Sequence, residues 1–364
     1  FSLGIVPSIA ASKIYLVPLL LYFICYHHVQ REQIISISLF IVGIGCFMAT
    51  AALVEYVWGQ RFMMSLSPAY VNATRGVFIE KLYRPFGTTG VPGSPATWVS
   101  LVAPFATYLL FQSRERLTTK ARMLCVYYFL ICGPVLLVCQ TRLAFLTTVA
   151  GAATTLYFNR KRFLPRLAVA LLFLALIVSP LYYKLTSALT KSSALSISQV
   201  MTLQDRMTTL TKKNAYTDSR ENPLPRIWRD INKFYILGLG LSRVGAAAGP
   251  WSDRISNHPY FQDFTVGWAD NLLVALFHEI GIPGLIIYFF IYSRVLLSLH
   301  RNARSAKLEF DRNCDYFFTW TCFVVGISIL ICGWAAEGAL YAPASIFLWL
   351  AFGLGSKEVA HAKQ

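Results

Sequence analysis

The chain has 364 residues, of which 56% are hydrophobic and only 14% are charged. This composition, with a mean hydropathy of +0.52, excludes an ordinary soluble domain and indicates a membrane protein. The formal net charge of +16 would suggest a nucleic-acid partner for a soluble protein. In a membrane protein, basic cytoplasmic loops account for much of such a charge, so we expect no nucleic acid.

Nine apolar segments have about the length and composition of membrane spans, because a helix needs about 20 apolar residues to cross a bilayer. We therefore predict an all-α polytopic membrane protein with about nine transmembrane helices. The segments are residues 3–26, 34–57, 96–113, 121–139, 143–159, 164–183, 268–293, 316–335 and 339–355. The predicted domains are 1–183 with the outer loop 58–95, the long outer loop 184–267, and 268–364 with the last three helices and a tail.

The basic residues of the short connectors predict the orientation, because Lys and Arg accumulate on the cytoplasmic side. They follow the first, third, fifth and seventh segments, so these connectors and the C-terminal tail are predicted to be cytoplasmic. Residue 1 then lies outside without an initiator Met, and a missing N-terminal piece and a cleaved signal peptide both fit. The basic residues are Arg31, Arg114, Arg116, Lys120, Arg122, Arg160, Lys161, Arg162, Arg166, Arg294, Arg301, Arg304, Lys307 and Arg312.

Two arginines stand at the predicted outer face in the first half of the chain. Arg84 opens a run of turn-forming residues that ends at Pro95, which predicts irregular backbone at the membrane surface. It either helps to hold an anion or belongs to a surface turn. Arg142 follows the fourth segment with almost no connector, so its charge must snorkel, pair or line a wet cavity. We favour a functional role for Arg142 because an outer charge runs against the usual bias.

The long outer loop contains an amphipathic stretch and a glycine pair. Apolar residues at 227, 228, 231 and 234 recur at helical spacing, which predicts either a surface helix or an anion-binding wall over the membrane. Gly238-Leu-Gly240 lacks the GxGxxG spacing and has no βαβ unit around it, so a nucleotide site is excluded. We interpret it as a turn that lets the backbone approach closely.

The seventh segment begins with polar residues. Asp270 lies in its first turn, where a carboxylate either caps the helix or accepts a proton from an incoming hydroxyl. His258 in the preceding loop is an alternative base. His278 and Glu279 lie two turns further on, and we expect structural roles for both, with Glu279 paired to a buried partner.

The eight cysteines do not suggest a disulfide framework or a metal site. Seven lie within the predicted spans or at their ends, and none lies in a large outer loop. We expect buried thiols that behave as small apolar residues.

The order of the polar motifs along the chain carries a resemblance. Arg142 follows a span, Arg226-x-Trp228 and Gly238-x-Gly240 lie in a long outer loop, Asp270-Asn271 opens a helix, and Glu279-x-Gly281-x-x-Gly284 follows. Together, over roughly residues 84–295, they resemble the O-antigen ligase and Wzy-type polysaccharide polymerase superfamily. The resemblance implies a fold like that of the GT-C glycosyltransferases, a long helical extracytoplasmic loop, and an active site on the periplasmic side of the bacterial inner membrane.

The resemblance also implies a reaction. Members transfer a glycan from undecaprenyl pyrophosphate to an acceptor hydroxyl, without metal, cofactor or nucleotide. Arg142 and Arg226 would hold the donor pyrophosphate, and Asp270 occupies the place where the ligases keep a histidine. Arg220 is the alternative candidate for the role of Arg226, because the spacing from Arg226 to Trp228 is shorter than the resemblance leads us to expect. The further candidates for substrate binding are Arg84, Arg220, His258, Trp228 and Asn271.

We therefore predict a polymerase of lipid-linked repeat units, since the ligase histidine is absent. The alternatives are a ligase that transfers the glycan to lipid A-core, a transporter for an anionic lipid or solute, and a non-catalytic scaffold. The expected partners are the lipid-linked donor glycan, an acceptor glycan or lipid A-core, membrane lipids and a chain-length regulator.

Overall fold

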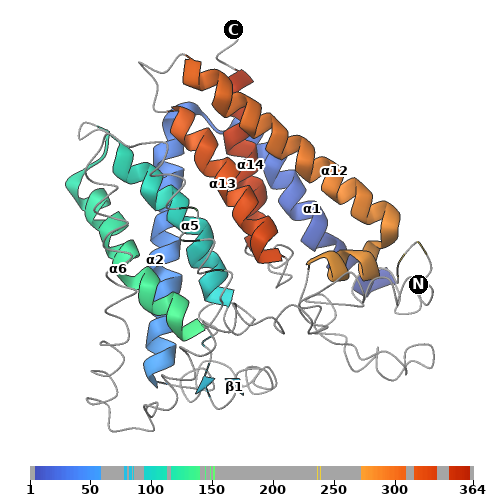
Figure 1. The fold of residues 1–364 in the computed structure, drawn as a ribbon, viewed down its shortest axis with the longest axis horizontal. Coiled ribbons are helices and arrows are strands. Elements are labelled where there is room, and N and C mark those ends of the chain that lie inside the picture. Colours follow the sequence, from blue (N-terminus) through green and yellow to red (C-terminus); the bar gives the residue numbers. More distant parts are fainter. Residues whose placement is uncertain are drawn as a thin grey trace, which may run out of the picture. The chain divides into compact units, whose positions relative to one another are not determined.

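The structure, a computed structural model, describes residues 5–58, 78–79, 82–83, 85, 94–112, 116–139, 144, 148, 151, 236, 238, 272–308, 315–333 and 344–360. Long α-helices form nearly all of this part (Figure 1). The predicted all-α class is therefore confirmed for the described residues. The chain divides into two compact units, Phe1–Val29 with Lys213–Gln364 (the α12 unit) and Gln30–Lys212 (the α2 unit).

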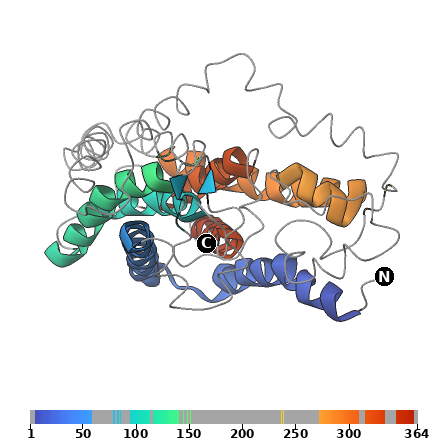
Figure 2. The ribbon, with the colours of Figure 1, turned by 90° about the horizontal axis from the view of Figure 1, so that it is seen from below.

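The α12 unit contains four of the helices. α1 packs against α14, while α12 and α13 pack against each other and against α14. Figure 2 shows α14 between α1 on one side and α12 and α13 on the other. The helices are α1 (Ile5–His28), α12 (Leu272–Leu308), α13 (Asp315–Gly333) and α14 (Ala344–Ala360).

Small residues allow these helices to approach closely. A Cβ atom added at Gly353 of α14 would lie 2.5 Å from the backbone oxygen of Tyr22 in α1, and one added at Gly326 of α13 would lie 2.6 Å from the Leu296 side chain in α12. The Tyr292 hydroxyl also donates to the Gly326 carbonyl at 2.7 Å. Membrane helices often associate in this way, because packing and interhelical hydrogen bonds replace the hydrophobic effect.

We expect Gly353→Ala to destabilise the α12 unit, because its new methyl group would meet backbone rather than a movable side chain. Overpacking of this kind costs about 1–3 kcal/mol. The melting temperature of the purified chain in detergent measures the effect. Gly43→Ala is the matched control, because a Cβ atom at Gly43 meets nothing within 4 Å. Equal melting temperatures for the two variants would contradict the close packing.

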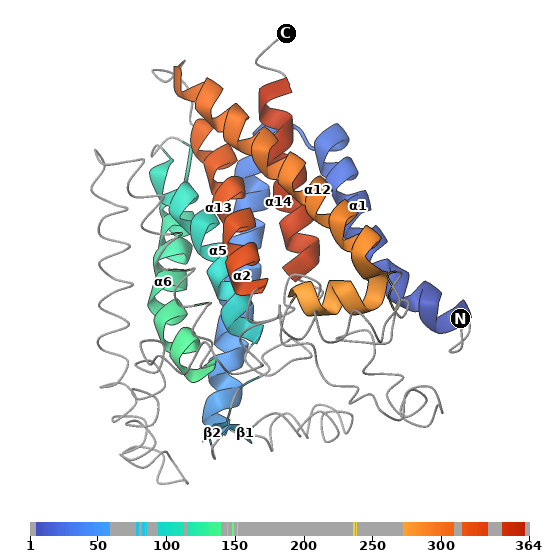
Figure 3. The ribbon, with the colours of Figure 1, turned by 45° about the vertical axis from the view of Figure 1, so that its right-hand side comes forward.

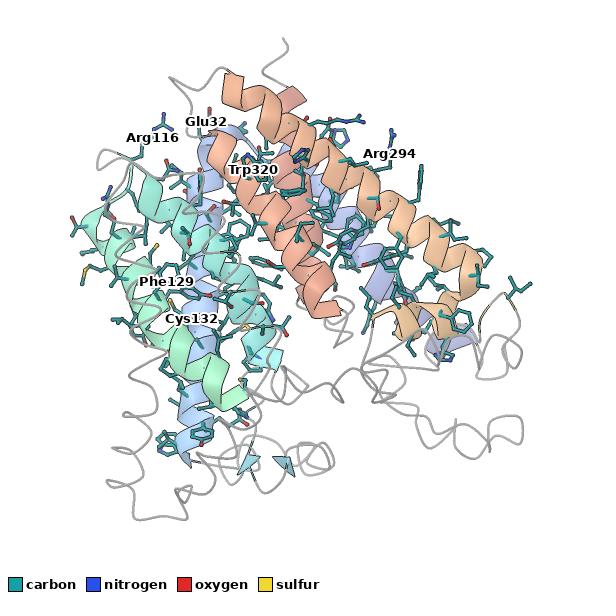
Figure 4. All side chains as sticks on the ribbon, in the orientation of Figure 1. Glu32, Arg116, Phe129, Cys132, Arg294 and Trp320 are labelled. Carbon is teal, nitrogen blue, oxygen red and sulfur yellow. The ribbon has the colours of Figure 1, made fainter. Side chains whose placement is uncertain are left out.

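In the part that the structure describes, the α2 unit contains three packed α-helices and a short 3-10 turn. It consists of α2 (Ile34–Trp58), preceded by a 3-10 turn (Arg31–Gln33), then α5 (Ser94–Phe111) and α6 (Thr119–Cys139). The three α-helices all pack against one another. Their fully buried apolar side chains include Val42, Phe105, Phe129 and Cys132. Figure 4 labels Phe129 and Cys132 on α6.

Polar contacts fix the direction of these helices. The Thr50 and Tyr127 hydroxyls lie 2.9 Å apart, and the Cys46 thiol lies 3.8 Å from the Leu124 carbonyl, so α2 and α6 run in the same direction. The Tyr128 hydroxyl donates to the Val99 carbonyl of α5. Within the α2 unit the order of directions therefore agrees with the alternation that the basic connectors predict.

A hydrogen bond joins the two sides of the predicted cytoplasmic connector between α5 and α6. The Arg122 guanidinium of α6 donates to the Gln112 carbonyl, just after α5, at 2.8 Å. A cation is favourable at the C-terminal end of a helix, where carbonyl groups point outward. Glu32 and Arg116 lie at this same end of the α2 unit (Figure 4).

Seven of the nine predicted spans correspond to described helices. The other two, at 143–159 and 164–183, lie outside the described residues apart from Ala144, Thr148 and Gly151. By length and composition, three described helices can cross a membrane: Ile34–Trp58, Thr119–Leu136 and Leu272–Ala303. Large apolar side chains remain exposed on the helices, as at Phe40 and Phe290, which suits contact with lipid.

Two features differ from the predicted elements. The seventh helix was predicted to end near residue 293, but α12 continues to Leu308. Arg294 and Arg301 therefore lie on a helix rather than in a connector, and Arg294 points away from the neighbouring helices (Figure 4). The outer loop 58–95 contains an antiparallel hairpin of β1 (Phe78–Ile79) and β2 (Leu82–Tyr83), which its sequence did not predict.

The cysteines behave as the sequence predicts. Six cysteines whose side chains the structure describes are buried and free, namely Cys25, Cys46, Cys125, Cys132, Cys139 and Cys322.

Candidate functional site

The predicted site residues lie outside the part of the chain that the structure describes, so their roles stay predictions. They are Arg84, Arg142, Arg220, Arg226, Trp228, His258, Asp270 and Asn271. The described residues begin again at Leu272, directly after Asp270-Asn271. They include four residues of the glycine motifs: Gly238, Glu279, Gly281 and Gly284. These four lie together in the α12 unit and define the local geometry.

α12 is broken at Gly281. The backbone there has φ 66° and ψ −171°, a conformation that only glycine adopts readily. Pro283 follows two residues later, and proline suits the first turn of a helix because its missing N–H has no intrahelical acceptor there. Figure 3 shows the consequence: the first segment of α12 (residues 272–280) runs at a steep angle to the longer segment after the break.

This break changes the prediction of one continuous span over 268–293. The segment from residue 282 to residue 303 alone is about 33 Å long, at 1.5 Å per residue, and matches a hydrocarbon core of about 30 Å. The first segment is therefore not needed to cross the membrane. It forms a separate short helix at the end of the span.

The loop before α12 contacts the break directly. Gly238 has φ 76°, and a Cβ atom added there would lie 2.5 Å from the Gly281 nitrogen and 3.1 Å from the Glu279 oxygen. The nearby Ile236 carbonyl accepts a 2.9 Å hydrogen bond from the Ile282 N–H. That amide starts a new helical segment and so lacks an acceptor within it. The predicted close backbone approach at the Gly-x-Gly motif is confirmed.

The break in α12 also requires a residue without a side chain at position 284. A Cβ atom added there would lie 2.5 Å from the Ile280 Cβ atom. Ile280 is the last residue before the break, and its side chain occupies the space beside Gly284. Gly281 thus supplies the backbone conformation and Gly284 the room, which explains the spacing of these two glycines.

Glu279 is bound by the first helix. The Tyr15 hydroxyl of α1 donates to Glu279 Oε2 at 2.5 Å, and only 4% of Glu279 is exposed. The predicted pairing of Glu279 is confirmed, but its partner Tyr15 is only partly buried. His278 beside it is also buried, and its ring lies 5.3 Å from that of Phe277.

The described part of the site is therefore a junction of three segments: Tyr15 of α1, Ile236 and Gly238 of the preceding loop, and residues 279–284 of α12. We call it the α12 junction. It holds the first segment of α12 at a defined angle, and this segment directly follows Asp270 and Asn271 in the sequence. Among the residues that the structure describes, no cluster of His, Cys, Asp or Glu could hold a metal ion.

The matched family agrees with this arrangement. Residues 127–289 match the family described as O-antigen ligase. The resemblance to the O-antigen ligase and Wzy-type superfamily is thereby confirmed. The O-antigen ligase region runs from α6 to just beyond the α12 junction, and in the sequence it includes Arg142, Arg226 and Asp270. No curated protein matches the chain.

The O-antigen ligase region and the apolar helices fit a membrane protein of polysaccharide biosynthesis. Tyr15 lies outside the O-antigen ligase region, and sequence reasoning did not single it out. A tyrosine in an apolar helix is an ordinary residue, and no spacing connects position 15 with position 279. The only signal was Glu279 itself, a carboxylate in an apolar helix that needs a donor.

Proposed function

We propose that this chain is an inner-membrane glycosyltransferase that polymerises oligosaccharide repeat units carried on undecaprenyl pyrophosphate. About nine transmembrane helices in a GT-C-like arrangement would carry the active site on the periplasmic side. The match of residues 127–289 to the O-antigen ligases carries this proposal, because it includes the arginines and the carboxylate that the reaction needs.

The proposed reaction is a direct displacement at the anomeric carbon, without a metal ion. The acceptor hydroxyl oxygen attacks that carbon, and its proton passes to the Asp270 carboxylate. The bond from the anomeric carbon to the pyrophosphate oxygen breaks, and undecaprenyl pyrophosphate leaves with the electron pair. Arg142 and Arg226 stabilise the negative charge that grows on this leaving group, because guanidinium groups pair with phosphate oxygens in a fork.

The remaining candidates have supporting roles in the proposal. Arg84 is an additional phosphate contact, and Arg220 is the alternative to Arg226 as the second phosphate-binding arginine. Trp228 and Asn271 contact the substrate beside them.

Polymerase is preferred over ligase because of one residue. Asp270 stands where the ligases keep a histidine, so the two activities differ at the proposed base. The α12 junction supports a base at this point of the chain, because it fixes the segment that follows Asp270. Ligation to lipid A-core is the second candidate, favoured by the description of the matched family.

The choice of base can be tested directly. In a strain lacking the protein, we expect Asp270→Ala to abolish the polymer ladder and His258→Ala to leave it intact. Glycan length and attachment are read on a gel, with protein amount from an immunoblot of the same membranes. A ladder that collapses to single repeat units indicates a polymerase, whereas free lipid-linked polymer that never reaches its anchor indicates a ligase. Full activity of Asp270→Ala with loss in His258→Ala would assign the base to His258.

A further inference from the structure

The contact between Tyr15 and Glu279 joins parts of the chain that are far apart in sequence. Tyr15 lies in the first described helix and Glu279 in α12, and their oxygens are 2.5 Å apart. The Tyr15 hydroxyl is the donor in this contact, and Glu279 Oε2 is the acceptor. Glu279 is almost completely buried, so the bond is shielded from competing water.

Glu279 lies next to the break in α12. It stands two residues before the break at Gly281, and its own backbone oxygen would lie 3.1 Å from a Cβ atom at Gly238. The side chain of Glu279 therefore binds α1 while its backbone contacts the preceding loop. Because the backbone at Gly281 is not helical, the contacts of Glu279 help to set the direction of the first segment of α12.

We infer that Tyr15 and Glu279 are a positioning pair for glycan transfer. Their hydrogen bond fixes the first segment of α12 relative to α1, and thereby the end of that segment, Leu272, which directly follows Asp270 and Asn271 in the sequence. This inference rests on the proposed function, which makes Asp270 the base. Neither residue touches the reacting atoms in this role; both act through the backbone that follows the base.

The geometry of transfer makes such positioning important. An acceptor oxygen, an anomeric carbon and a base must be aligned within a fraction of an ångström. A misplacement of about 1 Å caused by a distant substitution reduces a rate about 100-fold. Loss of the bond should therefore lower kcat and leave KM for the lipid-linked donor largely unchanged, since the arginines proposed to hold the pyrophosphate are retained.

The test uses the full chain, purified in lipid nanodiscs, with repeat units on undecaprenyl pyrophosphate extracted from the strain that lacks the protein. We expect Tyr15→Phe to lower kcat about 10- to 100-fold with KM changed less than about twofold. Tyr26→Phe is the matched control, because it removes a hydroxyl from the same helix and keeps the rings that stack against Tyr22. It should retain the kcat of the unaltered chain.

A second pair of variants separates positioning from folding. Glu279→Gln keeps an oxygen acceptor for the Tyr15 hydroxyl and should retain more activity than Glu279→Leu. Because both residues act through one bond, Tyr15→Phe combined with Glu279→Leu should be no worse than Glu279→Leu alone. A loss in the double variant equal to the product of the two single losses overturns the inference, as does a lower melting temperature with unchanged kcat.

Hydrogen exchange gives a readout that does not depend on the proposed function. We expect Tyr15→Phe to speed amide exchange over residues 272–280 relative to Tyr26→Phe, and equal exchange overturns the inference. If Asp270→Ala keeps full activity while Tyr15→Phe loses kcat and exchanges faster, the proposed base is wrong and the positioning pair stands.

Discussion

Replacing Arg142 or Arg226 by alanine is expected to reduce glycan transfer about 100- to 1,000-fold, the usual cost of removing one group that stabilises transition-state charge. Leaving-group departure creates new negative charge on the pyrophosphate, and a guanidinium fork neutralises it with two parallel hydrogen bonds. Transfer is measured with lipid-linked repeat units in membranes of a strain that lacks the protein, normalised to the amount of each variant.

The lysine variants sharpen this prediction. Arg142→Lys and Arg226→Lys keep the positive charge but lose the planar fork, so each should fall between its alanine variant and the unaltered chain. Arg294→Ala is the control, because Arg294 is exposed and points away from the neighbouring helices. Alanine variants of both Arg142 and Arg226 with undiminished transfer would exclude them from phosphate binding and favour a non-catalytic scaffold.

Replacing Gly281 or Gly238 by alanine is expected to cause the second large loss. Each residue has a positive φ, which costs about 1–2 kcal/mol for an ordinary residue. The new methyl group at Gly238 would also meet the backbone nitrogen of Gly281 at 2.5 Å. The loop and the break must then move apart, and the first segment of α12 changes its angle. We expect glycan transfer to fall about 100-fold, as for a misplaced reacting group.

Activity per correctly inserted protein separates this effect from simple loss of protein. Size-exclusion profiles in detergent and immunoblots of membranes give the inserted amount. Gly43→Ala serves as the control glycine, since it has open space around it and a helical alanine is favoured over glycine. Unchanged transfer in both Gly238→Ala and Gly281→Ala would show that the angle of the first segment does not matter to the reaction.

The membrane helices were predictable because their signal is local. A run of apolar residues needs no partner elsewhere in the chain to be recognised, and seven predicted spans coincide with described helices. The break in α12 could not be predicted from hydropathy. Residues on both sides of Gly281 are apolar, so hydropathy gave one long segment with its end misplaced before Leu308.

The candidate site was predictable only as an order of motifs. Gly-x-Gly and E-x-G-x-x-G were recognised separately, and the turn at Gly238 was interpreted correctly as a place of close backbone approach. That Gly238 meets Gly281 depends on three-dimensional folding, since both glycines are needed only when the two backbones touch. Likewise, the sequence predicted a buried partner for Glu279 but did not indicate which residue it is. The structure shows that the partner is the Tyr15 hydroxyl.

The contact of α1 with α14 has a consequence for the synthesis and membrane insertion of this protein. The ribosome delivers α1 to the bilayer early and α14 only after the residues between them have been translated. The surface around Tyr22 and Cys25 that Gly353 later covers must meanwhile face acyl chains or an insertase. Assembly of the α12 unit therefore waits for the translation of α14, and a stop codon before Ala344 should leave α1 without its packing partner and the product open to membrane proteases.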